Sequence, residues 1–173
     1  MPLDTAALAA HRHRVYRVAL RLTGCRDDAA DVTQEVLVRL WRHGDRVDEA
    51  KRTAWALRVT RNAALDLLRS RQTRTRYTLA HDGLTAAAPA DDHAPDDLAE
   101  AADVRRHLDH ALDGLDEPYK SIVVLREIEG LPYQDIADAL ELPLNTLKVY
   151  LHRARRRLRD ALRTTLPAEE LPS

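Results

Sequence analysis

The sequence YQDIADALELPLNTLKVYLHRARRRLR, residues 133–159, decides the fold expected for the second half of the chain. Apolar residues recur at helical spacing on both sides of residues 141–143, which predicts helices over 133–140 and 144–165. A short helix joined by a turn of about three or four residues to a long basic helix is typical of a helix-turn-helix.

The long basic helix separates its apolar residues from its charges. Leu147, Leu151, Ala154 and Leu158 fall on one side of a helical wheel, so we expect them to be buried. The opposite side carries Asn145, Lys148, Val149, His152, Arg156 and Arg159, flanked by Arg153 and Arg155. Solvated faces usually mix acids with bases, yet no acid stands between Glu141 and Asp160. The pattern favours DNA binding through the major groove, and an acidic protein partner is the alternative.

Helical spacing also dominates the rest of the 173 residues, which include no Phe. We expect an all-α protein with helices near residues 5–22, 27–41, 53–71, 97–112 and 118–129. Residues 76–100 contain Gly, Pro and clustered Asp, which is typical of a flexible acidic linker. The predicted organisation is therefore two small helical domains, 1–75 and 101–166, with a tail at 167–173.

The net charge of −1 conceals a strong partition along the chain. Residues 1–75 carry +6 and residues 76–103 carry −6. Local fields of this kind, rather than the total, decide what a polyanion meets. Arg58, Arg61 and Asn62 on the third helix form a second candidate nucleic-acid surface, because Asn62 could read a base edge.

Several classes of function are not supported by the sequence. Cys25 is the only cysteine, so an internal disulfide is excluded. No apolar run reaches the roughly 20 residues of a membrane span, and the N-terminus lacks a signal pattern, so we expect a cytoplasmic protein without membrane insertion. Asp103, His107 and His110 lack a fourth ligand, which argues against a metal. Phosphate loops and nucleophile elbows are absent, so we expect neither a cofactor nor an enzyme.

Three stretches occur together in a recognisable order: DAADVTQEVLVRLWR (28–42), TAWALRVTRNAALDLLRSR (53–71) and the segment 112–162. They resemble the extracytoplasmic-function (ECF) class of bacterial RNA polymerase sigma factors over about residues 8–75 and 104–165. The resemblance implies a sigma region 2-like domain of three to four helices and a sigma region 4-like helix-turn-helix domain. It also implies a function, which is to bind RNA polymerase core and direct promoter-specific transcription initiation at −10 and −35 elements.

The resemblance further implies partners and site residues. The first domain would bind the β′ clamp helices of polymerase, the second the β flap, and both would bind promoter DNA; such proteins are usually controlled by an anti-sigma factor. The residues implied for polymerase binding are Asp31, Gln34, Glu35, Val38 and Arg39. Those implied for binding the −10 element are Arg58, Arg61 and Asn62, near the loop that follows the second helix. Those implied for binding the −35 element are Asn145, Thr146, Lys148, Val149, His152 and Arg153, while Arg156 and Arg157 would bind DNA phosphates.

Two other functions remain open at this point. One is a helix-turn-helix promoter-binding regulator that does not bind core polymerase, and the other is a protein-interaction module with a basic helix. The corner of the helix-turn-helix carries Glu141 where glycine is frequent in the class, and a positive φ there would cost about 1 kcal/mol. Pro132 stands where a Ser or Thr cap is common, so the side-chain cap is forfeited.

Overall fold

The computed structural model describes residues 5–82 and 99–165, and every regular element in those ranges is a helix. The chain divides into two compact units, Met1–Asp92 and His93–Ser173. The predicted all-α class with two helical domains is confirmed. The central part of the predicted linker, residues 83–98, lies outside the described residues.

The first unit contains three long helices: α1 (Thr5–Thr23), α2 (Arg26–His43) and α3 (Glu49–Asp82). Helix α1 ends where Gly24 adopts a φ of 67°, a left-handed conformation that glycine accepts readily. Its N–H donates to the Leu20 carbonyl at 2.8 Å. Helix α2 then begins with Asp27 and Asp28 in its first turn, where acids suit the positive end of the helix dipole.

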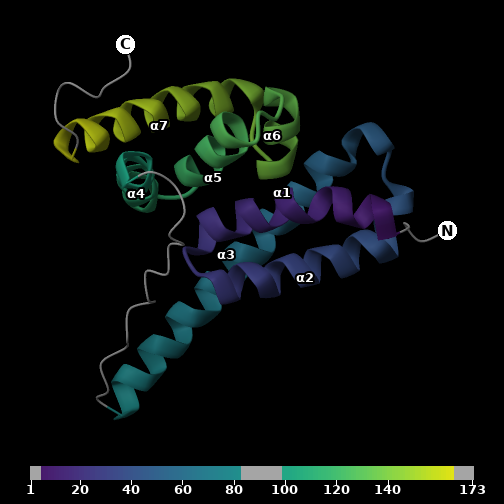
Figure 1. Cartoon of the computed structure of the whole chain (residues 1–173), viewed down its shortest axis with the longest axis horizontal. Helices are drawn as coiled ribbons and strands as arrows, with labels where there is room; N and C mark the ends of the chain where they lie inside the picture. Colours follow the sequence, from purple (N-terminus) through teal and green to yellow (C-terminus); the bar gives the residue numbers. More distant parts are fainter. Residues whose placement is uncertain (1–4, 83–98, 166–173) are drawn as a thin grey trace. The chain divides into compact units, whose positions relative to one another are not determined.

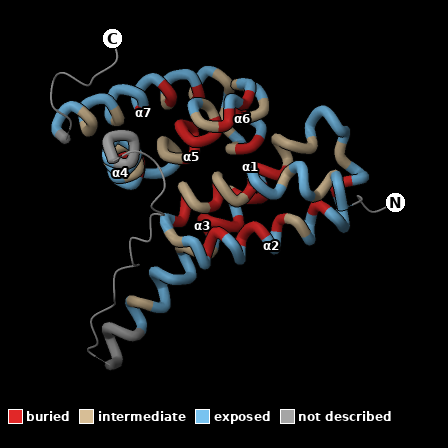
Figure 2. Tube along the Cα trace, in the orientation of Figure 1, coloured by how far each residue is buried: buried red, intermediate tan, exposed pale blue. Residues whose placement is uncertain are grey.

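The core of the first unit lies where the three helices face one another (Figure 2). Helix α1 contributes Val15 and Val18, α2 contributes Val32 and Val36, and α3 contributes Leu57, all fully buried or nearly so. The buried stripe of α2 also includes Ala29 and Leu40. Burial of this stripe leaves the other side of α2 in solvent.

Helix α3 is longer than the sequence predicts. It begins at Glu49 rather than Thr53 and runs to Asp82, into the range assigned to the linker. The physical reason is that no Gly or Pro interrupts residues 49–82, and the first stop signal is Gly83. The C-terminal part of α3 extends past the ends of α1 and α2 (Figure 1).

The second unit contains α4 (Ala99–Asp113), α5 (Tyr119–Val123), a π-helical turn η2 (Val124–Ile128), α6 (Tyr133–Leu140) and α7 (Leu144–Thr165). The single helix predicted over 118–129 is thus α5 followed by η2. Gly130 ends this segment with a φ of 68°, and the N–H of Leu131 donates to the Leu125 carbonyl at 3.0 Å. This bond spans six residues, one more than the usual 6→1 bond at a left-handed glycine, because the preceding turn η2 is π-helical.

Helices α6 and α7 form the predicted helix-turn-helix, with the bounds expected from the sequence. Glu141 turns the corner with φ 54° and ψ 41°, and the N–H of Leu142 donates to the Ala137 carbonyl at 2.9 Å. The positive φ considered for Glu141 is therefore present, at a cost of about 1 kcal/mol. Pro132 precedes α6 without a side-chain cap, as expected.

Candidate nucleic-acid and protein interfaces

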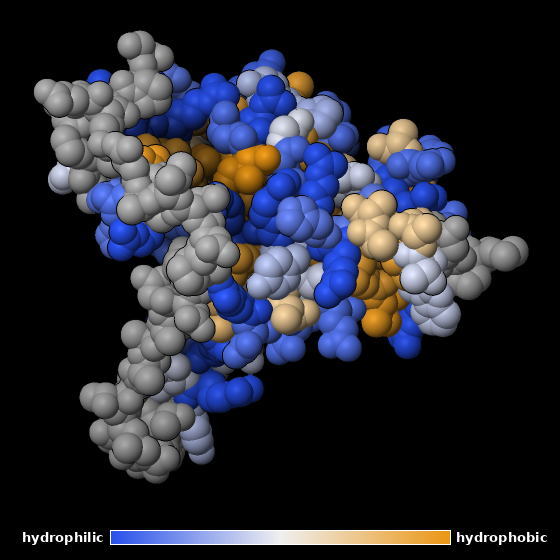
Figure 3. Space-filling model, viewed as in Figure 1, coloured by the Kyte–Doolittle hydropathy of each residue, from blue (hydrophilic) through white to orange (hydrophobic). Residues whose placement is uncertain are grey.

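The outer face of α7 carries the side chains that the sequence assigned to the −35 element. Leu147, Leu151 and Ala154 are buried on the inner side, and Leu158 is half-buried, so the predicted orientation of the helix is confirmed. The exposed set is Asn145, Lys148, Val149, His152, Arg153, Arg156 and Arg157, with Thr146 half-buried. Hydrophilic side chains cover α7 at the top of the view in Figure 3.

The cations of α7 fall into two groups according to their neighbours. Lys148, Arg153 and Arg159 form no ion pair with any residue that the structure describes. Arg156 reaches only Asp160 on its own helix, at 4.0 Å, with 79% of its side chain exposed. These four guanidinium and ammonium groups therefore remain available to an external anion.

Two other cations of α7 are held by the rest of the unit. Arg155 donates from Nε and from a terminal nitrogen to Oε1 of Glu127 on η2, at 2.9 and 2.6 Å. This hydrogen bond raises the pKa of Arg155. Arg157 lies over the ring of Tyr119 at 4.4 Å and 3.8 Å from Asp116. Arg157 thus packs against α5 with about half of its side chain exposed, and its assignment to a phosphate stays a prediction.

Aromatic contacts fix α7 and α6 against the preceding segment. The rings of Tyr119 and Tyr150 lie 5.3 Å apart at an angle of 52°. Arg126 of η2 lies 4.5 Å from the ring centre of Tyr133 and donates to the Leu131 carbonyl at 2.7 Å. Such pairs add stabilisation of about 0.5–1.5 kcal/mol each beyond buried area, so the orientation of α7 depends on η2 and α5 as well as on α6.

The three side chains assigned to the −10 element lie together on α3. Arg58 and Asn62 are exposed and one turn apart, and Arg61 is half-buried between them in sequence. Arg61 donates to Oδ1 of Asn62 at 3.2 Å, so this amide presents its NH₂ group outward. The opposite side of α3 at this level is buried through Leu57 and Thr60, whose hydroxyl donates to the Ala56 carbonyl.

The exposed side of α2 contains all five residues assigned to polymerase binding: Asp31, Gln34, Glu35, Val38 and Arg39. Arg39 and Glu35 pair at 2.5 Å within one turn of the helix. Val38 is 42% exposed, and Trp41, one turn further on, is 47% exposed. The sequence reasoning missed Trp41, although its spacing of three from Val38 and seven from Gln34 places it on the same face.

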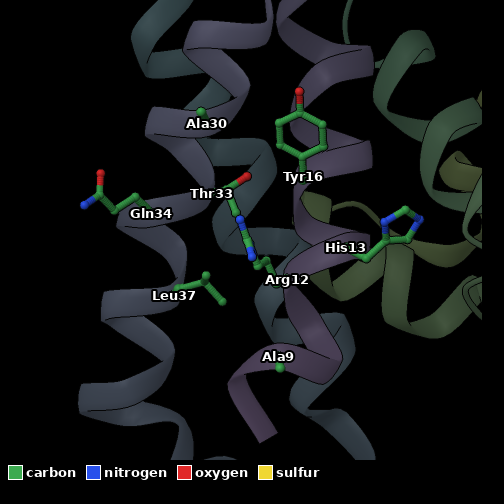
Figure 4. Close-up of a pocket in the computed structure, with 8 residues that line it drawn as sticks. All are labelled: Ala9, Arg12, His13, Tyr16, Ala30, Thr33, Gln34 and Leu37. Atoms are coloured by element: carbon green, nitrogen blue, oxygen red, sulfur yellow. The ribbon is translucent and has the colours of Figure 1, made fainter. Parts of the chain in front are cut away.

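A groove of about 640 Å³ lies between α1 and α2 and adjoins this face (Figure 4). Leu37 of α2 and Arg12 of α1 lie between the helices, whereas Gln34 points outward from α2 (Figure 4). The full lining is Ala9, Arg12, His13, Tyr16, Ala30, Thr33, Gln34 and Leu37. Since Gln34 belongs to both features, the groove continues the exposed side of α2 toward α1.

One arginine of α3 forms an ion pair with a buried acid of the first unit. Arg71 pairs with Asp28 at the start of α2 at 2.5 Å, and the Asp28 side chain is almost fully buried. The second carboxylate oxygen of Asp28 has no hydrogen-bond partner. Arg71 therefore neutralises a buried acid rather than adding to the free charge of α3.

The histidines weighed as metal ligands have another explanation. Nδ1 of His107 lies 2.8 Å from the carbonyl oxygen of Asp103 on its own helix. Across residues 5–82 and 99–165, no group of three His, Cys, Asp or Glu is placed to hold a metal ion. Within the same ranges, no helix is both long and apolar enough to span a bilayer.

Both units match family models of known proteins. The family models for Sigma-70 region 2 and Sigma-70 region 4 match residues 8–74 and 105–158. The ECF RNA polymerase sigma factor SigE of Mycolicibacterium smegmatis is 35% identical over 162 residues. The chain belongs to the ECF class of sigma factors. SigW of Bacillus subtilis, another ECF sigma factor, is 27% identical to this sigma factor over 161 residues.

The share of each relative that the chain covers differs. The match to SigE takes in 94% of this sigma factor and 62% of SigE, and the match to SigW takes in 88% and 85%. Among solved structures, the sigma factor RpoE in complex with the anti-sigma factor NepR from Bartonella quintana has a TM-score of 0.68 at 23% identity, covering 91% of this chain and 95% of RpoE. CnrH in complex with the cytosolic domain of CnrY has a TM-score of 0.66 at 22% identity, covering 92% and 86%. These structures show the same fold.

Proposed function

We propose that this sigma factor binds RNA polymerase core and directs it to promoters by recognising −10 and −35 elements. Residues 1–75 hold the polymerase and −10 surfaces, residues 101–166 hold the −35 surface, and residues 76–100 connect them. The observation that carries the proposal is the outer face of α7. Lys148, Arg153 and Arg159 pair with no described acid there, and Arg156 contacts only Asp160, at 4.0 Å. Unpaired cations on one face of a helix suit the regular charges of a DNA backbone.

The −35 surface divides by position along α7. Asn145, Thr146, Lys148 and Val149 occupy the first turns, which in a helix-turn-helix approach base edges in the major groove. His152, Arg153 and Arg156 follow on the same face and hold phosphates, which position the protein without reading sequence. Arg157 would have to leave Tyr119 and Asp116 to join them, so we assign it to packing in the free protein.

The −10 surface is the exposed side of α3 with the loop before it. Asn62 offers a donor to an unpaired base, while Arg58 and Arg61 lie close enough to neutralise the adjacent backbone.

The polymerase surface is the exposed side of α2. Its mixture of Asp31, Gln34 and Glu35 with the apolar Val38 resembles the centre of a protein interface with a polar rim. We add Trp41, because exposed Trp residues are frequent anchors of binding energy. The expected contact is the β′ clamp helices, with the second unit contacting the β flap.

Other aspects of the proposal follow from this role. The protein would act in the cytoplasm beside polymerase and would supply binding rather than catalysis, since RNA synthesis belongs to the polymerase. RpoE of Bartonella quintana, which has the same fold, is bound to an anti-sigma factor. A protein inhibitor of that kind is therefore among the partners to be tested.

The test is reconstitution with purified core polymerase. The chain should co-purify with core and confer start-site selection on a library of promoters randomised at the −10 and −35 positions. A chain that selects DNA without binding core is a conventional regulator, and a chain that binds neither is an interaction module. DNA affinity should fall steeply with salt, whereas an acidic protein partner would leave DNA binding absent at every salt concentration.

A further inference from the structure

Arg52, in the first turn of α3, extends back over the loop that joins α2 to α3. Its Nε donates to the carbonyl of Gly44 at 3.0 Å, and a terminal nitrogen donates to the carbonyl of Val47 at 3.4 Å. One guanidinium thus spans the beginning and the end of the turn from Gly44 to Val47. The Arg52 side chain is half-buried, so these bonds are partly shielded from water.

Two backbone hydrogen bonds also close this loop in the part of the chain that the structure describes. The N–H of Val47 donates to the Gly44 carbonyl at 3.3 Å, and the N–H of Lys51 donates to the Asp48 carbonyl at 2.9 Å. The Gly44 carbonyl consequently accepts from both Val47 and Arg52. The turn itself is one short 3-10 segment, η1 (Gly44–Arg46), in which Gly44 is buried while the next two residues are exposed.

Helix α1 also approaches Arg52. The pKa of His11 is lowered, first by burial and then by the positive charges of Arg52 and Arg14. Arg52 therefore lies near His11 of α1 while it bonds both ends of the loop between α2 and α3. A side chain that bonds both ends of a loop can hold the loop in one conformation more firmly than the loop's own backbone bonds.

We propose that Arg52 is a positioning residue that sets the conformation of the loop over residues 44–48 for recognition of the −10 element. The inference rests on the proposed function. The loop contains no aromatic residue that could stack on a base, so its selectivity depends on hydrogen bonds made by polar side chains, with Arg46 as a donor and Asp48 as an acceptor. Hydrogen bonds discriminate only when donor and acceptor are held in fixed positions, and Arg52 supplies that constraint.

The test compares Arg52→Gln with Arg52→Lys and Lys51→Gln in the full chain bound to core polymerase. Lys51→Gln removes one positive charge at the neighbouring position, while both carbonyl bonds of Arg52 remain. Base preference is measured by open-complex formation on promoters randomised across the −10 element. Affinity for core polymerase and for −35 duplex is measured in parallel.

Arg52→Gln should reduce the preference for the best −10 sequence by about tenfold, the effect of losing charge-assisted hydrogen bonds. Arg52→Lys, which cannot reach two carbonyls with one fork, should lose most of the same preference. Lys51→Gln should keep it, and binding to core and to −35 duplex should stay within about twofold for all three variants. Hydrogen exchange at the Val47 amide should accelerate in Arg52→Gln and in Arg52→Lys but not in Lys51→Gln.

Two outcomes overturn the inference. In the first, the wild-type chain selects promoters and Arg52→Gln selects them equally well, even if its melting temperature falls. In the second, Lys51→Gln loses the same preference, which would make charge rather than geometry the cause. Failure of the wild-type chain itself to select any promoter would instead refute the proposed function, and Val47 exchange would still report whether Arg52 holds the loop.

Discussion

Arg155 on α7 and Glu127 on η2, 28 residues apart in sequence, share two hydrogen bonds through one carboxylate oxygen. The contact joins the basic helix to the segment that precedes the helix-turn-helix. Its neighbour Arg156 points to solvent. Arg155 therefore packs within the second unit, whereas the adjacent Arg156 remains available to an external anion. The two roles can be measured separately.

Arg155→Ala should lower the stability of the chain by about 1 kcal/mol or less, because the pair is partly exposed. Arg156→Ala should leave thermal unfolding unchanged and weaken binding about equally across −35 sequences, with the salt slope reduced by about one. Calorimetry and salt-dependent DNA titration separate the two. Glu127→Ala combined with Arg155→Ala should cost no more than either alone, and a change of sequence preference in Arg156→Ala would contradict its phosphate role.

Asn62→Ala should impair promoter melting while −35 binding stays intact, because the two surfaces belong to different units. Permanganate reactivity of unpaired thymines in the −10 region measures the melting. Asn145→Ala is the matched control, since it removes the same amide from α7 and should weaken −35 binding instead. Normal melting by Asn62→Ala would remove Asn62 from the −10 surface.

Arg71→Ala should destabilise the first unit by about 2 kcal/mol, a value between that of exposed and fully buried ion pairs. The reason is that Asp28 would keep a buried carboxylate without its cation. Arg69→Ala is the control, because Arg69 pairs with Asp66 in full solvent. Urea unfolding of both variants gives the comparison, and equal stability would show that Asp28 does not require Arg71.

Acidification should destabilise the first unit through His11. Its pKa in the folded chain lies below the ordinary value of 6.5, so the unfolded chain binds the proton more readily. The contribution is complete above about pH 6.5 and is lost as the pH falls through that value toward the lower folded pKa. His11→Gln should flatten the dependence of melting temperature on pH in this window, and an unchanged profile would contradict the assignment.

Trp41→Ala should weaken binding to core polymerase by about tenfold, as expected for a large aromatic anchor at an interface. Fluorescence anisotropy with labelled chain measures the affinity. Because Trp41 is nearly half exposed, its removal should leave the fold intact. Val149→Ala, an exposed apolar residue of the other unit, should have no effect on core affinity; unchanged binding by Trp41→Ala would remove this residue from the interface.

Much of the fold could be predicted because local signals were strong. The bounds of α6 and α7 follow from an apolar repeat interrupted only at Glu141–Pro143, and the burial of Leu147, Leu151 and Ala154 follows from the same repeat. The end of α3 could not be placed in this way. Composition suggested a linker from residue 76, whereas the backbone continues as helix until the first glycine after it.

The partners of charges that lie far apart in the chain could not be predicted from the sequence. The pairs Arg155–Glu127 and Arg71–Asp28 join residues far apart in the chain, and they form only because two helices pack at one particular angle. Helical periodicity places a residue on a face, but it cannot distinguish a guanidinium that is free from one that is already engaged. The contact of Arg157 with Tyr119 is another neighbour that periodicity does not reveal.

The left-handed backbone at Glu141 determines which substitutions this corner tolerates. Its left-handed backbone would be less strained with glycine, but glycine would also give the unfolded chain more freedom to lose, so the two effects partly offset each other. Glycine and a polar residue can therefore replace each other at this position at little net cost in folding stability. A sequence criterion that demands glycine between the two helices would pass over this protein, although its geometry is intact.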